Sequence, residues 1–283
     1  MEYLIQGETL AGIAAEVKRL CEIEGLMTPD EMKEALAAVE PGGGSSDLIN
    51  GIIDKSITTI KMKDLDGLTT IGERAFYNCK SLTDVELPDT ISSIDRYAFG
   101  SCSAIKKITM PIDAALTYDS FSGVNKVEEI IITAGNTGVL KSTYTYYPWY
   151  ISRKVLNKVT LQEGIMSIGK QMFYECSNIQ SIIIPNSVTV IDYGAFLYCT
   201  GLTTINIPHG VTRIEGSAFM SCSNLNTIYI PNTITGIATE AFYGTSLTDV
   251  YYEGTEEEWS AIDFEGTAID GFANATIHYN TPM

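Results

Sequence analysis

Among the residue types that can act as nucleophiles or metal ligands, cysteine has the most regular placement. Five of the six cysteines stand three residues after an aromatic residue, at Cys79, Cys102, Cys176, Cys199 and Cys222. Because cysteine is small and commonly buried, we interpret this column as part of the core. Stacked coils would bring neighbouring thiols to about the spacing of a disulfide, but the last three form an odd column that cannot pair completely. We therefore expect free thiols.

The other groups suited to catalysis do not form a recognisable site. The two histidines, His209 and His278, are far apart in the sequence, and no C-x-x-C pair occurs. The sequence therefore offers neither a recognisable set of zinc ligands nor a Cys-His catalytic pair. Residues 256–258 are three glutamates, but Thr255 before them and Trp259 after them favour the capped start of a helix. No phosphate-loop, dinucleotide-binding or nucleophile-elbow motif is present. We predict no enzyme, no cofactor and no metal, with both histidines at the surface.

One aromatic position recurs along most of the chain and sets its organisation. It is occupied by Phe76, Phe99, Phe121, Phe173, Phe196, Phe219 and Phe242. The intervals are 23, 22, 52, 23, 23 and 23 residues, and Tyr150 divides the long one into 29 and 23. Such a period is typical of repeat architectures, in which each coil is stable only when stacked on its neighbours. The sequence predicts a β-rich solenoid of about eight coils of ~23 residues, with Tyr150 as the core aromatic of the irregular coil.

Each coil is expected to contain one strand. Aliphatic residues stand six, nine and eleven residues after the aromatic and a proline follows at twelve, as from Leu82 to Pro88. Alternation with period two indicates a half-buried strand that the proline ends. The outward positions are then Asp84 and Glu86, Lys107 and Thr109, Glu129 and Ile131, Lys158 and Thr160, Ser181 and Ile183, Thr204 and Asn206, Thr227 and Tyr229, and Asp249 and Tyr251. They predict a ladder about 35 Å long, a protein-sized surface on which Ile183, Asn206 and Tyr229 are candidate contacts.

These residues carry a resemblance to a known family. The pattern L-T-x-I-x-I-P-x-x-V-x-x-I-x-x-x-A-F-x-x-C, seen from Leu202 to Cys222, resembles the BspA-like subclass of leucine-rich repeats. The segment from Val250 to Asn280 resembles the closing segment often found in that family. The resemblance covers roughly residues 56–280. It implies a right-handed solenoid with roles in adhesion and binding to other macromolecules, and it implies no catalytic residues.

The sequence before the repeats predicts a separate unit. Residues 1–40 carry an apolar stripe and a capped second helix, which indicate a helical hairpin, and residues 41–50 have the composition of a flexible linker. We expect the solenoid to span 51–254 and a C-terminal cap to span 255–283. The hairpin, with residues 48–60, resembles the leading segments of prophage tail-fibre and baseplate-like proteins. A two-helix cap or a dimerising hairpin is the alternative.

The coil between Phe121 and Tyr150 breaks the repeat. It has six additional residues, Thr133 replaces the proline, and the insertion carries Tyr144, Tyr146, Tyr147 and Trp149. Insertions in solenoids usually emerge as loops on one face, where aromatic side chains can form a binding platform. We therefore name these four aromatics as candidate partner-binding residues. The alternative is that they pack over the irregular coil and fill a gap in the core.

Composition narrows the class of partner. The chain has 35 acidic and 18 basic residues, a net charge of −17, which is unsuited to binding phosphates or anionic lipids. The N-terminus lacks the basic region and the uninterrupted apolar stretch of a signal peptide, and no run is long enough to span a membrane. We expect synthesis in the cytoplasm, followed by incorporation into a phage-like particle or export to the cell surface.

The leading hypothesis is a non-enzymatic recognition or adhesion module that binds a protein or a surface glycan and serves as a prophage tail-associated component. One alternative is an exported BspA-like cell-surface adhesin. Another is an unrecognised enzyme on a repeat scaffold. No nucleic acid and no membrane insertion are expected, while the ligand and the oligomeric state are left open.

Overall fold

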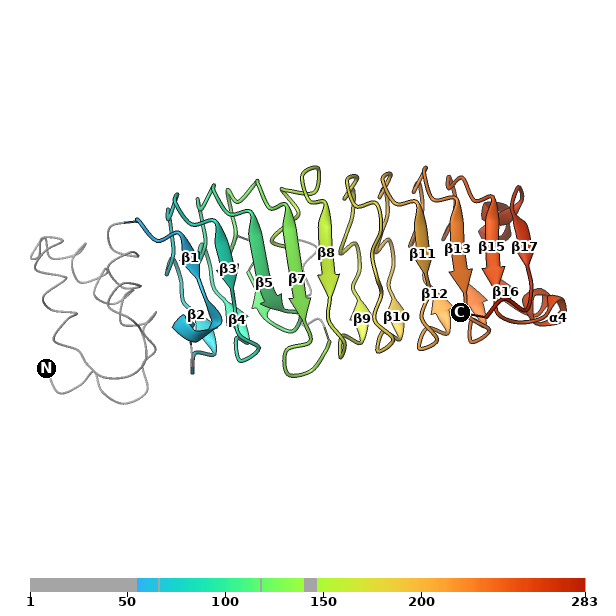
Figure 1. Cartoon of the computed structure of the whole chain (residues 1–283), viewed down its shortest axis with the longest axis horizontal. Helices are drawn as coiled ribbons and strands as arrows, with labels where there is room; N and C mark the ends of the chain where they lie inside the picture. Colours follow the sequence, from blue (N-terminus) through green and yellow to red (C-terminus); the bar gives the residue numbers. More distant parts are fainter. Residues whose placement is uncertain (1–54, 66, 118, 140–146, 283) are drawn as a thin grey trace, which may run out of the picture.

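The described part of the chain is an elongated β-solenoid of about nine turns, whose strands stack along its long axis (Figure 1). The computed structural model describes residues 55–65, 67–117, 119–139 and 147–282. The predicted helical hairpin and linker lie outside these residues, as do Tyr144 and Tyr146, so the statements about them stay predictions. No helix within the described residues is long and apolar enough to cross a membrane.

The main sheet is formed by the parallel strands that the sequence predicts, except that the strand predicted at residues 181–184 is not formed in the turn between β8 and β11. Its first part contains β1 (Thr59–Ile60), β3 (Asp84–Glu86), β5 (Lys107–Pro111), β7 (Glu129–Thr133) and β8 (Lys158–Leu161). Its second part contains β11 (Thr204–Asn206), β13 (Thr227–Ile230), β15 (Asp249–Tyr252) and β17 (Thr276–His278). Equivalent repeat positions face one another, as Val85 faces Ile108 and Ile205 faces Ile228. The predicted count of eight coils was too low, because β1 and β17 extend the ladder at its two ends.

A second set of shorter parallel strands lies on the other side of the core. It contains β2 (Thr70–Ile71), β4 (Ser93–Ile94) and β6 (Ala115–Leu116), and then β9 (Ser167–Ile168), β10 (Val190–Ile191), β12 (Arg213–Ile214), β14 (Gly236–Ile237) and β16 (Asp263–Phe264). The aliphatic residue five before the core aromatic, such as Ile94 or Ile214, is the buried member of each pair. Two residues are too few for a detectable period, so the sequence did not predict this sheet.

The core between the two sheets is built around a stack of phenylalanine rings. Five consecutive pairs, from Phe76 to Phe121 and from Phe173 to Phe242, have ring centroids 4.8 to 5.4 Å apart and nearly parallel planes. Offset aromatic stacking of this kind stabilises a core beyond the burial of its area. All seven predicted phenylalanines are buried. Because each ring contacts the ring of the next turn, stability comes from contacts between turns, as expected for a solenoid.

The turn around each core phenylalanine contains backbone in the left-handed region. Around Phe219, for example, Ser217 has φ 55° and Ser221 has φ 57°. Non-glycine residues adopt this conformation at a cost of roughly 1 kcal/mol each. Hydrogen bonds from one turn to the next offset that cost, since the amide of Phe219 donates to the carbonyl of Ala241 at 2.8 Å.

The C-terminal end of the stack is covered by aromatic residues from a short helical region. The helix α4 (Glu256–Ser260) begins at Thr255, whose side chain and Glu258 form a reciprocal capping box, so the predicted capped helix is confirmed. Trp259 meets Phe272 edge to face, and Phe272 packs against Phe242, the last ring of the stack, at 5.0 Å. Phe272 ends the 3₁₀ helix η2 (Ala268–Phe272), and a second, η1 (Met62–Leu65), follows β1.

Candidate recognition surface

The strand residues that point away from the core form two rows along the main sheet, which we call the outward face. Residues at the same repeat position face one another across successive strands: Asp84, Lys107, Glu129 and Lys158 in one row, with Glu86, Thr109, Ile131 and Thr160 in the other. In the second part of the sheet, Thr204, Thr227, Asp249 and Thr276 continue the first row, and Asn206, Tyr229, Tyr251 and His278 continue the second. The burial patterns of these strands agree with the parity that the sequence predicts, except that Thr109 is buried.

The N-terminal half of the outward face is a set of paired charges, which we call the charged half. Glu129 lies between Lys107 at 3.6 Å and Lys158 at 2.9 Å, and Lys61 pairs with Glu86 at 2.7 Å. The hydrogen bond from Lys158 is the main reason that the pKa of the Glu129 carboxyl lies below its ordinary value. These charges satisfy one another, so a partner contacting this half would have to desolvate existing ion pairs.

The C-terminal half differs in chemistry, and we call residues 181–183, 204–206, 227–229 and Tyr251 the neutral half. Tyr229 stacks on Tyr251 with centroids 4.8 Å apart, and Tyr251 stacks on His278 at 4.6 Å. His278 Nε2 lies 2.9 Å from Asp249 Oδ1, a hydrogen bond that lowers the pKa of this exposed aspartate. Tyr229, Tyr251 and His278 therefore form an aromatic row on the sheet. The carboxylate of Asp249 beside this row is already hydrogen-bonded to His278.

A groove of about 540 Å³ adjoins the aromatic row. It is lined by Glu163, by residues 181–186, and by Thr204, Asn206, Ile207, Pro208 and His209. Ile183 is 86% exposed. Most other outward positions on this face carry polar residues, so an exposed isoleucine is unusual there. His209 is held beside the groove by Glu253, with Nε2 and Oε2 3.0 Å apart. Both histidines reach solvent, and among the described residues no group of three or more His, Cys, Asp or Glu could hold a metal ion.

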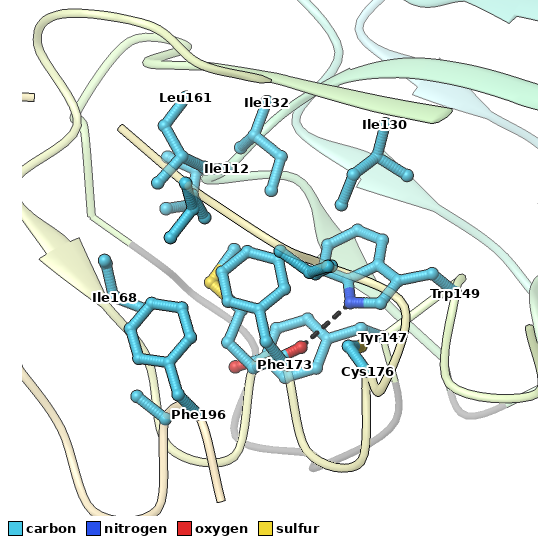
Figure 2. Close-up of a cluster of buried hydrophobic side chains, with 14 of the residues drawn as sticks. Ile112, Ile130, Ile132, Tyr147, Trp149, Leu161, Ile168, Phe173, Cys176 and Phe196 are labelled. Carbon is cyan, nitrogen blue, oxygen red and sulfur yellow. Dashed lines mark hydrogen bonds between the residues drawn. The ribbon is translucent and has the colours of Figure 1, made fainter. Parts of the chain in front are cut away.

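The structure corrects the assignment of the aromatic insertion. Trp149 and Tyr147, proposed from the sequence as anchors for a partner, are only 3% and 5% exposed. Figure 2 shows them inside the core beside Phe173, with the Trp149 indole N–H donating to the carbonyl of Met172 at 2.8 Å. Trp149 stacks on Tyr147 at 5.1 Å and faces Phe173 at 6.1 Å. Both side chains fill the irregular coil, so neither is available to a partner in this conformation.

The predicted core aromatic Tyr150 is also corrected, because Trp149 occupies that position. Tyr150 is half-buried on the turn surface, where its ring stacks on Tyr174 and Arg153 lies over it at 4.6 Å. One extra residue between Ser152 and Leu156 causes the shift. The amide of Leu156 donates to Ser152 four residues back, whereas the amide of Leu82 donates to Cys79 three residues back. Ser152, fully buried, thus replaces the cysteine of the regular coils.

The three candidates from the predicted strands lie at outward positions. Ile183 and Asn206 are exposed, Tyr229 is half-buried, and Asn206 faces Tyr229 in adjacent strands. Tyr251 and His278 were not predicted as contact residues, although both occupy the same repeat position as Tyr229. The sequence contains this row, since Tyr251 and His278 align with Tyr229 when the last two coils are aligned with the others. The groove was indicated in the sequence only by Ile183, an apolar residue at an outward position.

The cysteine column is buried and its thiols point to backbone carbonyls. Cys199 Sγ donates to Phe173 at 3.0 Å and Cys222 Sγ donates to Phe196 at 3.1 Å. The five described cysteines are free and buried, as the sequence predicts. Burial raises the pKa of Cys176 and that of Cys222 to about 12, because the charged thiolate is poorly solvated there.

We expect these five thiols to resist labelling in the folded protein. A disulfide reagent such as dithionitrobenzoate reacts with the thiolate, and at pH 8 a buried thiol with a raised pKa supplies almost none. Peptide mapping by mass spectrometry after a short exposure should find Cys176, Cys199 and Cys222 unmodified, and fully modified after unfolding in urea. Rapid modification of any of the three in the folded state would contradict their placement in the core.

One protein-family model agrees with this architecture. The family model described as BspA type leucine rich repeat region matches residues 53–148 and 147–269 in six copies. A leucine-rich repeat protein from Bacteroides ovatus is 25% identical, with 78% of this chain and 65% of that chain covered and a TM-score of 0.47. The leucine-rich repeat protein of T. pallidum is 18% identical, with 68% and 77% covered and a TM-score of 0.44.

A leucine-rich cell surface protein from Faecalibacterium prausnitzii is 19% identical, with 75% of this chain covered and a TM-score of 0.36; the chain spans 64% of the length of that relative. No curated protein sequence matches. The family model covers well over half of the chain, and its repeats coincide with the stacked turns of the structure. The chain belongs to the BspA type leucine-rich-repeat family.

Proposed function

We propose that this protein is a non-enzymatic recognition or adhesion module and that the neutral half of its outward face contacts a protein or a surface glycan. One observation carries the proposal. Asn206 and Tyr229 face each other in adjacent strands, and the exposed Ile183 lines a groove of about 540 Å³ together with Asn206. A repeat scaffold that presents such a rigid surface is consistent with a binding module.

The chemistry of the neutral half suits macromolecular contact. Tyrosine buries a large area with few rotamers lost and keeps a polar hydroxyl, so Tyr229 and Tyr251 can contribute affinity at low entropic cost. Covering neutral threonine and asparagine costs less than covering ions, provided that their hydrogen bonds are replaced. The charged half offers neither advantage, because Glu129 and Glu86 are already paired with lysines.

Where the module acts is a separate part of the proposal. Resemblance of the repeats to adhesion proteins supports display at a cell surface, and the resemblance of residues 1–40 to prophage tail proteins supports assembly into a phage-like particle. Genes that encode tail and baseplate proteins next to this gene would favour the particle. Genes for secretion or cell-wall anchoring would favour the cell surface.

Replacing Ile183, Asn206 and Tyr229 together by alanine should weaken binding about tenfold or more, since central contacts each contribute roughly 1–2 kcal/mol. Wild type and variant would be compared on a surface-glycan array and on immobilised bacterial envelope proteins, with the bound fraction measured by fluorescence. The matched control replaces Asp84 and Glu86 by alanine in the charged half, and it should bind like wild type. Equal binding by the triple variant at unchanged melting temperature would remove the neutral half from the site.

A further inference from the structure

Charge is distributed unevenly along the solenoid. Residues 171–283 contain 12 acidic residues and one basic residue, Arg213, whereas residues 55–170 contain 12 acidic and 14 basic residues. The one guanidinium of the C-terminal part is already paired, since Arg213 lies 2.7 Å from Glu265 and 3.2 Å from Glu215. The C-terminal part, which contributes most of the groove lining, therefore attracts positively charged partners and repels negatively charged ones.

Carboxylates lie at the rim of the groove. Glu163 is exposed and lines the groove, where its Oε1 accepts a hydrogen bond from the amide of Asn186 at 3.3 Å. His209 also lines the groove, and its hydrogen bond to Glu253 lowers the pKa of that carboxyl, which is therefore ionised at neutral pH. Among the described residues that line the groove there is no lysine or arginine. The rim is thus a site of negative charge.

The centre of the groove is apolar. Ile183 is exposed there, and the buried Ile182, Ile184 and Ile207 line the groove beside it. Covering an exposed isoleucine is favourable, because apolar surface is removed from water. Protein interfaces commonly combine an apolar centre, which supplies most of the affinity, with a polar rim that selects the partner. The groove has both parts.

We propose that the groove anchors a basic protein segment, in which an apolar side chain packs on Ile183 and a neighbouring lysine or arginine pairs with Glu163. The inference rests on the proposed function and narrows its partner from protein or glycan to a basic protein segment. Three residues separate Ile183 from Asn186, beside which Glu163 is held, so the two contacts lie at most about 10 Å apart. An apolar residue and a lysine one or two positions away in the partner can span this distance.

The lining of the groove favours such a segment over a sugar. No aromatic residue lines it among the described residues, so no ring face is available there for a sugar ring to stack on. In the aromatic row, the faces of Tyr251 are taken by Tyr229 and His278. Neutral and acidic sugars also bring no positive charge to the carboxylates of the rim. A basic protein segment matches both the apolar centre and the negative rim.

Titration of the full chain with synthetic peptides tests the partner. The probe is an octapeptide with a central leucine flanked by lysines, compared with one in which glutamates replace the lysines and one in which serine replaces the leucine. The methyl NMR signals of Ile183 report contact at the groove. The lysine–leucine peptide should shift them, and the glutamate–leucine peptide should bind at least about tenfold more weakly, because like charges across an interface are unfavourable.

Two variants separate the anchor from the rim. Ile183→Ser should weaken binding of the lysine–leucine peptide about fivefold and leave the lysine–serine peptide almost unaffected, since the two apolar side chains are coupled only when both are present. Glu163→Gln should weaken the lysine–leucine peptide more than Glu257→Gln does, a control that removes the same charge from an exposed position of α4. All three side chains are exposed, so the melting temperature should stay unchanged.

The outcomes separate the two proposals. If the lysine–leucine peptide does not shift the Ile183 signals, or binds no better than the glutamate–leucine peptide, the groove does not anchor a basic segment. The same conclusion follows if Glu163→Gln and Glu257→Gln have equal effects and Ile183→Ser has none, which would indicate unspecific charge attraction. If in addition a glycan array shows binding that the triple alanine variant at Ile183, Asn206 and Tyr229 abolishes, the proposed recognition surface stands and its partner is a glycan. If neither peptides nor glycans depend on these residues, both proposals fail.

Discussion

Replacing Trp149 by alanine should lower the free energy of unfolding by about 3–5 kcal/mol, the range observed for truncating a buried tryptophan or phenylalanine. The indole is almost completely buried, faces Phe173, and donates a hydrogen bond to the carbonyl of Met172. Its loss would leave a cavity in the irregular coil and an unpaired buried carbonyl. Both effects destabilise the contact between this turn and the next.

The neighbouring residue provides the matched control. Tyr150→Ala should cost about 1 kcal/mol or less, because this ring is half-buried and its contact with Arg153 is at the surface. Urea unfolding followed by circular dichroism measures both variants. Trp149→Phe should fall between them, since it keeps most of the ring and loses the hydrogen bond. If Tyr150→Ala were the more destabilising change, Tyr150 and not Trp149 would be the core aromatic, as the sequence alone suggested.

Replacing Gly138 by alanine should destabilise the protein by about 3 kcal/mol or more, through two independent effects. A Cβ atom there would lie 2.0 Å from the backbone carbonyl oxygen of Gly164, which cannot move without breaking the stacking of two turns. Gly138 also has φ +64°, a left-handed conformation that costs other residues roughly 1 kcal/mol. Its amide and carbonyl bond to Ala134 and Met166, both at 2.8 Å, so the backbone is fixed on both sides.

Gly67→Ala separates these two effects. Gly67 has φ +75° but nothing within 4 Å of a Cβ atom, so alanine there should cost only the conformational penalty of about 1 kcal/mol. The difference in urea midpoint between the two variants measures the clash at Gly164. Similar midpoints for both would mean that the turn at Gly138 can move away, against the close approach seen in the structure.

The sequence by itself determined the repeat and everything that follows directly from it. A constant interval of about 23 residues places identical positions one above another, so the register of the main sheet, the stack of phenylalanines and the buried cysteine column could be predicted without coordinates. The capped helix after Thr255 was predictable for a similar reason, because a capping box needs only residues three apart. The outward rows containing Ile183, Asn206 and Tyr229 followed from the two-residue period of a strand.

Tertiary structure decided the features that depend on contacts between turns. The spacing placed Tyr150 in the core, but one extra residue after Ser152 lets Trp149 reach the carbonyl of Met172 in the next turn, and that contact is invisible in a linear pattern. The short second sheet, the stacking within the aromatic row and the groove lined by Ile183 also depend on how closely successive turns approach. Sequence period fixes which residues face one another, whereas the distance between facing residues results from packing, so the candidate groove could be found only in the structure.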